Sequence, residues 1–194
     1  MEKKPFIFGV ATSGDNFTDR EKETSRLVLN FRHGVNTVLI SPRRWGKTSL
    51  VQKACRLAQS DKLKVVYIDI FSCRSDRDFY DAFASAILKQ TSSKLDEWLE
   101  HAKLFLSRIS PKISLGTDPM TDFSISLEMN PKSNEIDEIL QLPEKIAQKK
   151  GCNIVVCIDE FQQIAEFKDS RSGYARSGNC RNQCLTAYSA AKNT

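Results

Sequence analysis

Ser41-Pro42-Arg43-Arg44-Trp45-Gly46-Lys47-Thr48 is the stretch that decides how this chain folds. It follows Thr37-Val38-Leu39-Ile40, a short β-branched and apolar run that is typical of a buried strand. It precedes residues 49–58, in which apolar side chains recur at the spacing of one helix face. The sequence therefore predicts a strand, a loop and a helix, in that order.

The same stretch matches the phosphate-binding loop pattern G-x-x-x-x-G-K-[ST] at Gly46, Lys47 and Thr48. In that pattern, backbone N–H groups surround phosphates and the helix N-terminus adds partial positive charge. Ser41 stands where the first glycine is expected, and a positive φ there would be sterically costly for serine. A bare Gly-Lys-Thr also fits an ordinary turn before a helix, but the flanking strand and helix favour nucleotide binding.

The side chains of this loop suit particular roles. Lys47 can reach the β- and γ-phosphates as a point charge, and the Thr48 hydroxyl is a hard oxygen ligand suited to Mg²⁺. The residues predicted to contact the nucleotide from the loop and the first helical turn are Ser41, Pro42, Arg43, Arg44, Trp45, Gly46, Lys47, Thr48 and Ser49.

A second stretch with chemical potential runs from Asn153 to Glu160. Its continuous apolar run predicts a strand buried on both faces, so the acids that follow emerge at the carboxyl end of the sheet, where ligands bind. Asp159 is predicted to hold Mg²⁺ with Thr48, and Glu160 to act with Lys47 in catalysis by orienting the attacking water. Taken alone, the two acids could simply mark the end of a strand.

The rest of the sequence predicts an α/β fold. Residues 63–71 form a second β-rich run, which completes a β-α-β unit on a parallel sheet. Two period-two runs within about residues 111–130 predict an inserted β-hairpin. Residues 134–150 are helical, with Pro143 expected to kink or restart the helix and Gly151 expected to end it.

Composition narrows the class of protein. The 194 residues are 40% hydrophobic with a dispersed net charge of +5, which fits one globular domain with a solvated, mildly basic surface. The six cysteines show no C-x-x-C spacing and predict reduced, mostly buried thiols. No apolar run reaches the ~18–20 residues of a membrane span, and we expect a cytoplasmic protein without a signal peptide or membrane partner.

These motifs resemble the archaeal-type ATPase family of the AAA+/STAND P-loop proteins over about residues 17–167. Phe17-Thr18-Asp19-Arg20-Glu21-Lys22-Glu23 is similar to the family's N-terminal box, the loop at 41–48 to its arginine-rich Walker A motif, and Ile158-Asp159-Glu160-Phe161-Gln162 to its Walker B motif. The resemblance implies that serine is tolerated at the first loop position and that Phe17 and Arg20 approach the adenine.

The resemblance also implies the architecture and activity. The expected fold is that of a P-loop NTPase, three layers of α/β/α with a mainly parallel sheet, within a core of residues 1–169. The expected function is ATP hydrolysis with Mg²⁺, used as a nucleotide switch. The alternative is a non-hydrolysing module that associates with protein or DNA, although Lys47, Thr48, Asp159 and Glu160 argue for hydrolysis. A protein or DNA effector and a homo-oligomer are partners that the resemblance leaves open.

Residues 170–194 depart from the family pattern. They show little apolar periodicity, which predicts an aberrant, disordered tail and an incomplete, catalytically impaired domain. A frameshift would explain this: when residues 171–193 are reread from the third base of each codon, a permitted choice of codons gives an amphipathic helix and then an apolar strand ending in Gly-Ser. That order is similar to the family segment after Walker B, whose strand carries the γ-phosphate sensor and lies between the strands of the two motifs.

Overall fold

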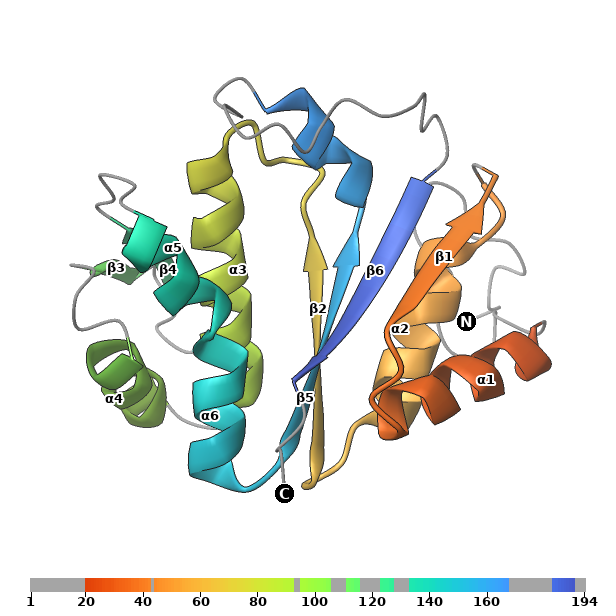
Figure 1. The fold of residues 1–194 in the computed structure, drawn as a ribbon, viewed down its shortest axis with the longest axis horizontal. Coiled ribbons are helices and arrows are strands. Elements are labelled where there is room, and N and C mark those ends of the chain that lie inside the picture. Colours follow the sequence, from red (N-terminus) through yellow and green to blue (C-terminus); the bar gives the residue numbers. More distant parts are fainter. Residues whose placement is uncertain are drawn as a thin grey trace, which may run out of the picture.

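The computed structural model describes residues 20–42, 44–92, 95–105, 111–115, 123–127, 133–167 and 183–190. Helices and strands alternate along much of the chain, as the predicted α/β class requires (Figure 1). In chain order the elements are α1 (Glu21–Arg32), β1 (Thr37–Ser41), α2 (Lys47–Ala58), β2 (Leu63–Asp69), α3 (Asp76–Thr91), α4 (Leu95–Phe105), β3 (Pro111–Leu115), β4 (Phe123–Leu127), α5 (Ser133–Leu140), α6 (Leu142–Lys150), β5 (Asn153–Asp159), the 3-10 helix η2 (Phe161–Glu166) and β6 (Gln183–Ala190).

The central sheet has the strand order β1-β6-β5-β2. β2 and β5 are parallel and in register from Leu63 opposite Asn153 to Asp69 opposite Asp159. β6 runs antiparallel to both of its neighbours, β1 and β5. The arrowheads of β1, β2 and β5 therefore point to one edge of the sheet while β6 points away from it (Figure 1). The loop after β1 meets Asp159, the last residue of β5, at that edge.

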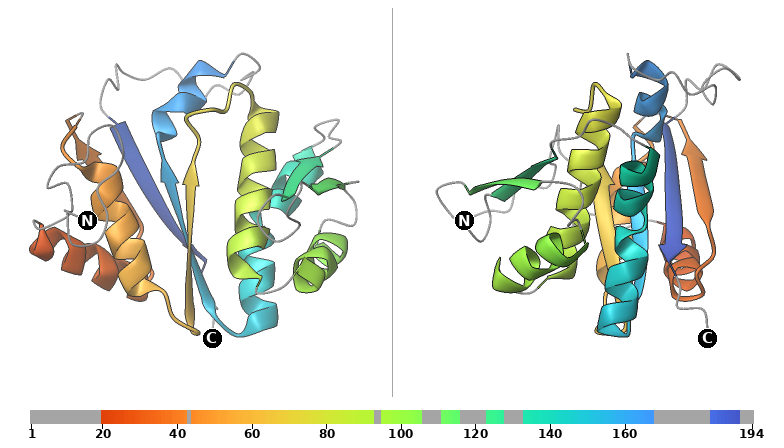
Figure 2. Two further views of the ribbon diagram at one scale, coloured as in Figure 1. Left: turned by 180° about the vertical axis from the view of Figure 1, so that it is seen from behind. Right: turned by 60° about the vertical axis from the view of Figure 1, so that its left-hand side comes forward.

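Two apolar cores flank this sheet because successive side chains of a strand face opposite sides. Val65 and Val155 face the side covered by α1 and α2, where they pack with Leu50. Val66 and Val156 face the other side and pack with residues of α3, α5 and α6. Figures 1 and 2 show these two groups of helices on opposite sides of the sheet. α2, which begins at the loop, is thus fixed to the sheet by buried apolar contacts.

β6 differs from what the sequence predicts. Residues 183–190 fall within the segment expected to be a disordered tail, yet they form a strand in the slot between β1 and β5. The expected parallel sheet is correspondingly mixed, since two of its neighbouring strand pairs are antiparallel. The physical reason is pairing: a strand in this slot satisfies backbone groups on the facing edges of β1 and β5. Residues 170–182 and 191–194 lie outside the described part of the chain.

Other local predictions are confirmed. β3 and β4 form a separate antiparallel pair in the region of the expected hairpin. The helical stretch after Ser133 is interrupted and restarts as α6, with Pro143 in its first turn, where proline's missing N–H is tolerated. Gly151 ends α6 with a φ of 65°. Cys55, Cys73, Cys152 and Cys157 are free and buried.

Among the described residues, no helix combines the length and the apolar character needed to cross a membrane. The side chains of the two remaining cysteines, Cys180 and Cys184, lie outside the description, so the prediction of buried thiols is confirmed for the other four alone.

Candidate functional site

The loop between β1 and α2 turns at Arg44 and Gly46. Gly46 has a φ of 68° and directly precedes the first helical residue, Lys47. Arg44 has a φ of 65°, a left-handed conformation that is uncommon for a residue with a side chain. Ser41 instead belongs to the extended strand β1. The steric cost predicted for Ser41 is therefore absent there, because the strand continues through that residue and the loop turns three residues later.

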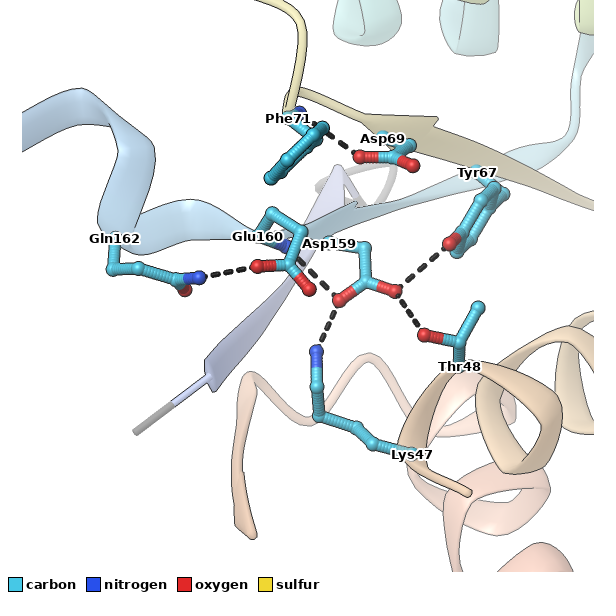
Figure 3. Close-up of polar contacts among 8 residues, drawn as sticks. All are labelled: Lys47, Thr48, Tyr67, Asp69, Phe71, Asp159, Glu160 and Gln162. Carbon is cyan, nitrogen blue, oxygen red and sulfur yellow. Dashed lines mark hydrogen bonds and ion pairs between the residues drawn. The ribbon is translucent and has the colours of Figure 1, made fainter. Parts of the chain in front are cut away.

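Lys47, Thr48 and Asp159 come together at the carboxyl edge of the sheet (Figure 3). Lys47 and Asp159 are only 3% and 2% exposed, and the Lys47 ammonium forms an ion pair with Asp159 Oδ1. The Thr48 hydroxyl donates to Asp159 Oδ2 at 2.8 Å. This contact joins the start of α2 to the end of β5, two segments far apart in sequence. The cluster can form because both lie at the same edge of the sheet.

Asp159 is held as a carboxylate by its neighbours. Burial by itself would raise the pKa of this side chain, but the hydrogen bond and charge of Lys47, together with the hydroxyls of Thr48 and Tyr67, lower the pKa below its ordinary value. The backbone N–H of Glu160 also donates to Asp159 Oδ1 at 2.9 Å. Each carboxylate oxygen therefore accepts two hydrogen bonds, and the group stays ionised in a buried position.

Tyr67 was not identified from the sequence as a site residue. Its hydroxyl donates to Asp159 Oδ2 at 2.8 Å, and Figure 3 shows the phenol directed at the carboxylate from β2. Burial, followed by the nearby charge of Asp159, raises the pKa of Tyr67, so the hydroxyl keeps its proton and can donate it. The available signal was positional: Tyr67 lies on the same face of β2 as Leu63 and Val65, and β2 is the strand paired with β5.

Glu160 follows Asp159 in an unusual backbone conformation. Its φ of 57° is left-handed, and it precedes η2, whose Phe161 and Ile164 pack against one of the apolar cores. The Gln162 amide donates to Glu160 Oε2, which fixes the carboxylate beside Asp159 (Figure 3). Such conformations cost about 1–3 kcal/mol and concentrate at functional sites. The packing of η2 supplies the surrounding structure that holds this one in place.

Other predicted site residues lie along the loop and in the first turn of α2. Pro42, Arg44 and Trp45 are exposed along the loop, and Ser49 is buried in the first turn of α2. Ser41 Oγ is buried and has no hydrogen-bond partner among the described residues.

The predicted adenine contacts remain predictions. Arg20 directly precedes α1, where its carbonyl oxygen accepts the Thr24 hydroxyl at 2.8 Å. Arg43 and Phe17 lie outside the described residues.

A cavity of about 290 Å³ opens beside this cluster. It is lined by residues of α2, β2 and α3, which include Gln52, Arg56, Tyr67 and Gln90. Residues 41–48 are not part of its lining. Tyr67 is thus shared between the cavity wall and the Asp159 cluster, whereas Pro42, Arg44 and Trp45 of the loop are exposed.

The chemistry of the cluster suits a phosphate and a hard metal ion. α2 begins with N–H groups that point out of the helix end, and Lys47 adds a full positive charge beside them. Thr48 and Asp159 supply hydroxyl and carboxylate oxygens, which are the ligands that Mg²⁺ prefers. A second carboxylate, Glu160, stands next to them.

Comparison with known proteins agrees with this chemistry. Neither the curated proteins nor the solved structures contain a match to the chain. Residues 17–176, most of the chain, match a family described as an ATPase domain predominantly from Archaea. This range contains the loop, the paired acids and the whole Lys47–Thr48–Asp159 cluster. The chain therefore belongs to the family of ATPase domains found predominantly in Archaea.

Proposed function

We propose that this domain binds and hydrolyses ATP with Mg²⁺, as a P-loop ATPase of the AAA+/STAND type with a three-layer α/β/α core. The observation that carries the proposal is the buried contact of Lys47 and Thr48 with Asp159, at the edge where the strands β1 and β5 end. Membership of an ATPase family indicates that the nucleotide is ATP, and this cluster supplies groups that suit the phosphates of ATP.

The residues present fit both ligands. Ser41 Oγ is a buried hydroxyl at the start of the loop that has no hydrogen-bond partner among the described residues, so it is available to a phosphate oxygen. Thr48 and Asp159 would hold Mg²⁺, which when bound neutralises charge on the phosphates. Lys47 and the N–H groups at the start of α2 would hold the β- and γ-phosphates.

Lys47 and Glu160 have separate roles in hydrolysis. Lys47 leaves Asp159 and turns to the phosphates, where it offsets negative charge as the γ-phosphoryl group transfers. Glu160, fixed by Gln162, orients a water molecule and accepts its proton as the water oxygen bonds to the γ-phosphorus. The bond from that phosphorus to the β–γ bridging oxygen breaks, and ADP and inorganic phosphate leave. The movement of Lys47 between two partners provides the basis of a nucleotide switch.

Binding of a fluorescent ATP analogue with Mg²⁺ tests the proposal. The parent protein and Lys47→Ala are compared, with Lys62→Ala as a matched control, since Lys62 is an exposed lysine just before β2, at the end of that strand remote from the cluster. All three are first checked for folding by circular dichroism. We expect the parent and Lys62→Ala to bind and Lys47→Ala to lose most of its affinity. A folded parent that fails to bind would refute the proposal.

Turnover is tested separately with Glu160→Gln. This substitution keeps the size of the side chain and removes its ability to accept a proton. Phosphate release should fall by about 10²–10⁴-fold while nucleotide binding persists. If the parent binds but releases no phosphate, and instead binds DNA with a steep salt dependence, the module acts in association rather than hydrolysis.

A further inference from the structure

Tyr67 occupies a position that the proposed function has not used. Its hydroxyl reaches Asp159 Oδ2, the oxygen that also accepts the Thr48 hydroxyl. Tyr67 comes from β2 and Thr48 from α2, so two elements converge on a single carboxylate oxygen. Figure 3 shows them approaching Asp159 from different directions.

The Tyr67 backbone is anchored at the outer edge of the sheet. β2 is an edge strand, so on one side its N–H and C=O groups have no neighbouring strand in the described sheet. The side-chain amide of Gln90, from α3, takes the place of a strand: its oxygen accepts the Tyr67 N–H at 3.0 Å and its nitrogen donates to the Tyr67 carbonyl at 2.9 Å. Both backbone groups of Tyr67 are therefore fixed on that side.

The phenol is also held from the side of α2. Gln52, one turn beyond Thr48 on that helix, hydrogen-bonds to the Tyr67 hydroxyl. The hydroxyl can accept from Gln52 while it donates to Asp159, so its proton is directed at the carboxylate. The phenol therefore has a defined orientation, set by groups from α2 and β5.

The four donors around Asp159 differ in what a ligand would require of them. The Lys47 ammonium is the group that phosphates attract, and the Thr48 hydroxyl is the group that Mg²⁺ requires. Tyr67 and the Glu160 N–H have neither task and can keep their hydrogen bonds to Asp159. Hydrogen bonds to a ligating carboxylate orient it, and their loss typically weakens metal binding by about 10–100-fold.

We propose that Tyr67 is a positioning residue, which holds Asp159 in the orientation needed to bind Mg²⁺ after Lys47 has moved to the phosphates. This inference rests on the proposed function. It assigns a role to a tyrosine of β2 outside both sequence motifs. Because the hydroxyl acts on Asp159, its removal should affect metal-dependent nucleotide binding and leave metal-free binding unchanged.

The test compares nucleotide affinity with and without metal. A fluorescent ATP analogue is titrated into the parent, Tyr67→Phe and Tyr80→Phe, first in EDTA and then at increasing free Mg²⁺. Tyr80→Phe is the matched control, because it removes a hydroxyl from a partly buried tyrosine that packs against the core on α3. We expect all three to bind equally in EDTA. The Mg²⁺ concentration that gives half of the metal-dependent gain should rise about tenfold or more in Tyr67→Phe alone.

The outcomes separate this inference from the function on which it rests. Asp159→Asn should abolish the gain from Mg²⁺, and a parent without nucleotide binding would overturn the proposed function and the role of Tyr67 together. If the parent and Asp159→Asn behave as expected but Tyr67→Phe has the parent's Mg²⁺ midpoint, the role of Tyr67 is wrong and the function stands. Should Tyr67→Phe not fold, Gln52→Leu takes its place: it should raise the midpoint severalfold, and an unchanged midpoint overturns the inference.

Discussion

The buried ion pair between Lys47 and Asp159 predicts unequal costs for removing its two members. Removing one partner of a buried pair costs about 3–5 kcal/mol, since the other charge is left uncompensated. In Lys47→Met, Asp159 keeps the hydroxyls of Thr48 and Tyr67 and the Glu160 N–H. In Asp159→Asn, the 3% exposed Lys47 loses the partner of its ion pair. Asp159→Asn should therefore lie near the upper end of this range and Lys47→Met near the lower end.

The double variant, which carries both substitutions, gives a sharper test, because the sign of its change in stability relative to Asp159→Asn is predicted. Methionine carries no charge, so Lys47→Met removes the buried ammonium that Asp159→Asn leaves uncompensated. The double variant should be more stable than Asp159→Asn alone, with a coupling energy of about 1–3 kcal/mol between the two positions.

Urea unfolding of the ligand-free protein, followed by circular dichroism, measures these differences. A loss of about 4 kcal/mol at a slope of about 2 kcal/mol per molar urea lowers the midpoint by about 2 M. Asp61→Asn, which neutralises an exposed aspartate, is the matched control and should leave the midpoint unchanged. Additive losses in the double variant, or a larger loss for Lys47→Met than for Asp159→Asn, would refute the reasoning.

Three further predictions concern other parts of the molecule. Burial, with two nearby lysines, lowers the pKa of His101. Folding stability should therefore decline as the pH falls below about 6.5, because the unfolded state then binds a proton that the folded state does not. His101→Gln should flatten this decline in pH-dependent unfolding curves. Gly151→Ala should destabilise the protein by about 1 kcal/mol in urea unfolding through its φ of 65° alone, since an added Cβ meets nothing within 4 Å. Sequencing of the coding region should reveal a second reading frame across residues 171–193 that continues into an apolar strand; its absence would exclude the frameshift.

The strand–loop–helix unit and the acids at the end of β5 were predictable because each depends on local pattern. Apolar periodicity identifies β1 and α2, and a continuous apolar run identifies β5. Parallel strands bring their carboxyl ends to one edge, so the meeting of Lys47, Thr48 and Asp159 follows from direction and order.

The features that could not be predicted depend on contacts between residues far apart in the sequence, or on backbone conformations that are close in free energy. Tyr67 reads as one more aromatic residue of a strand, and only the register of β2 against β5 brings its hydroxyl to Asp159. The left-handed conformation of the loop falls on Arg44 rather than on Ser41 because β1 continues through Ser41. β6 is a strand because two facing edges need a partner, a requirement that residues 183–190 do not themselves encode.

The ion pair between Lys47 and Asp159 also bears on how nucleotide and metal would act together. Lys47 already has a partner, so turning to the phosphates exchanges one ion pair for another and yields less than the full gain of a new one. The exchange leaves Asp159 buried with neutral donors and an unbalanced negative charge, which favours a cation in the place that Lys47 has left. Phosphate binding should therefore strengthen Mg²⁺ binding, and by linkage Mg²⁺ should strengthen nucleotide binding by the same factor. Lys47→Met, whose Asp159 carries an unbalanced charge from the outset, should bind Mg²⁺ more tightly than the parent when nucleotide is absent.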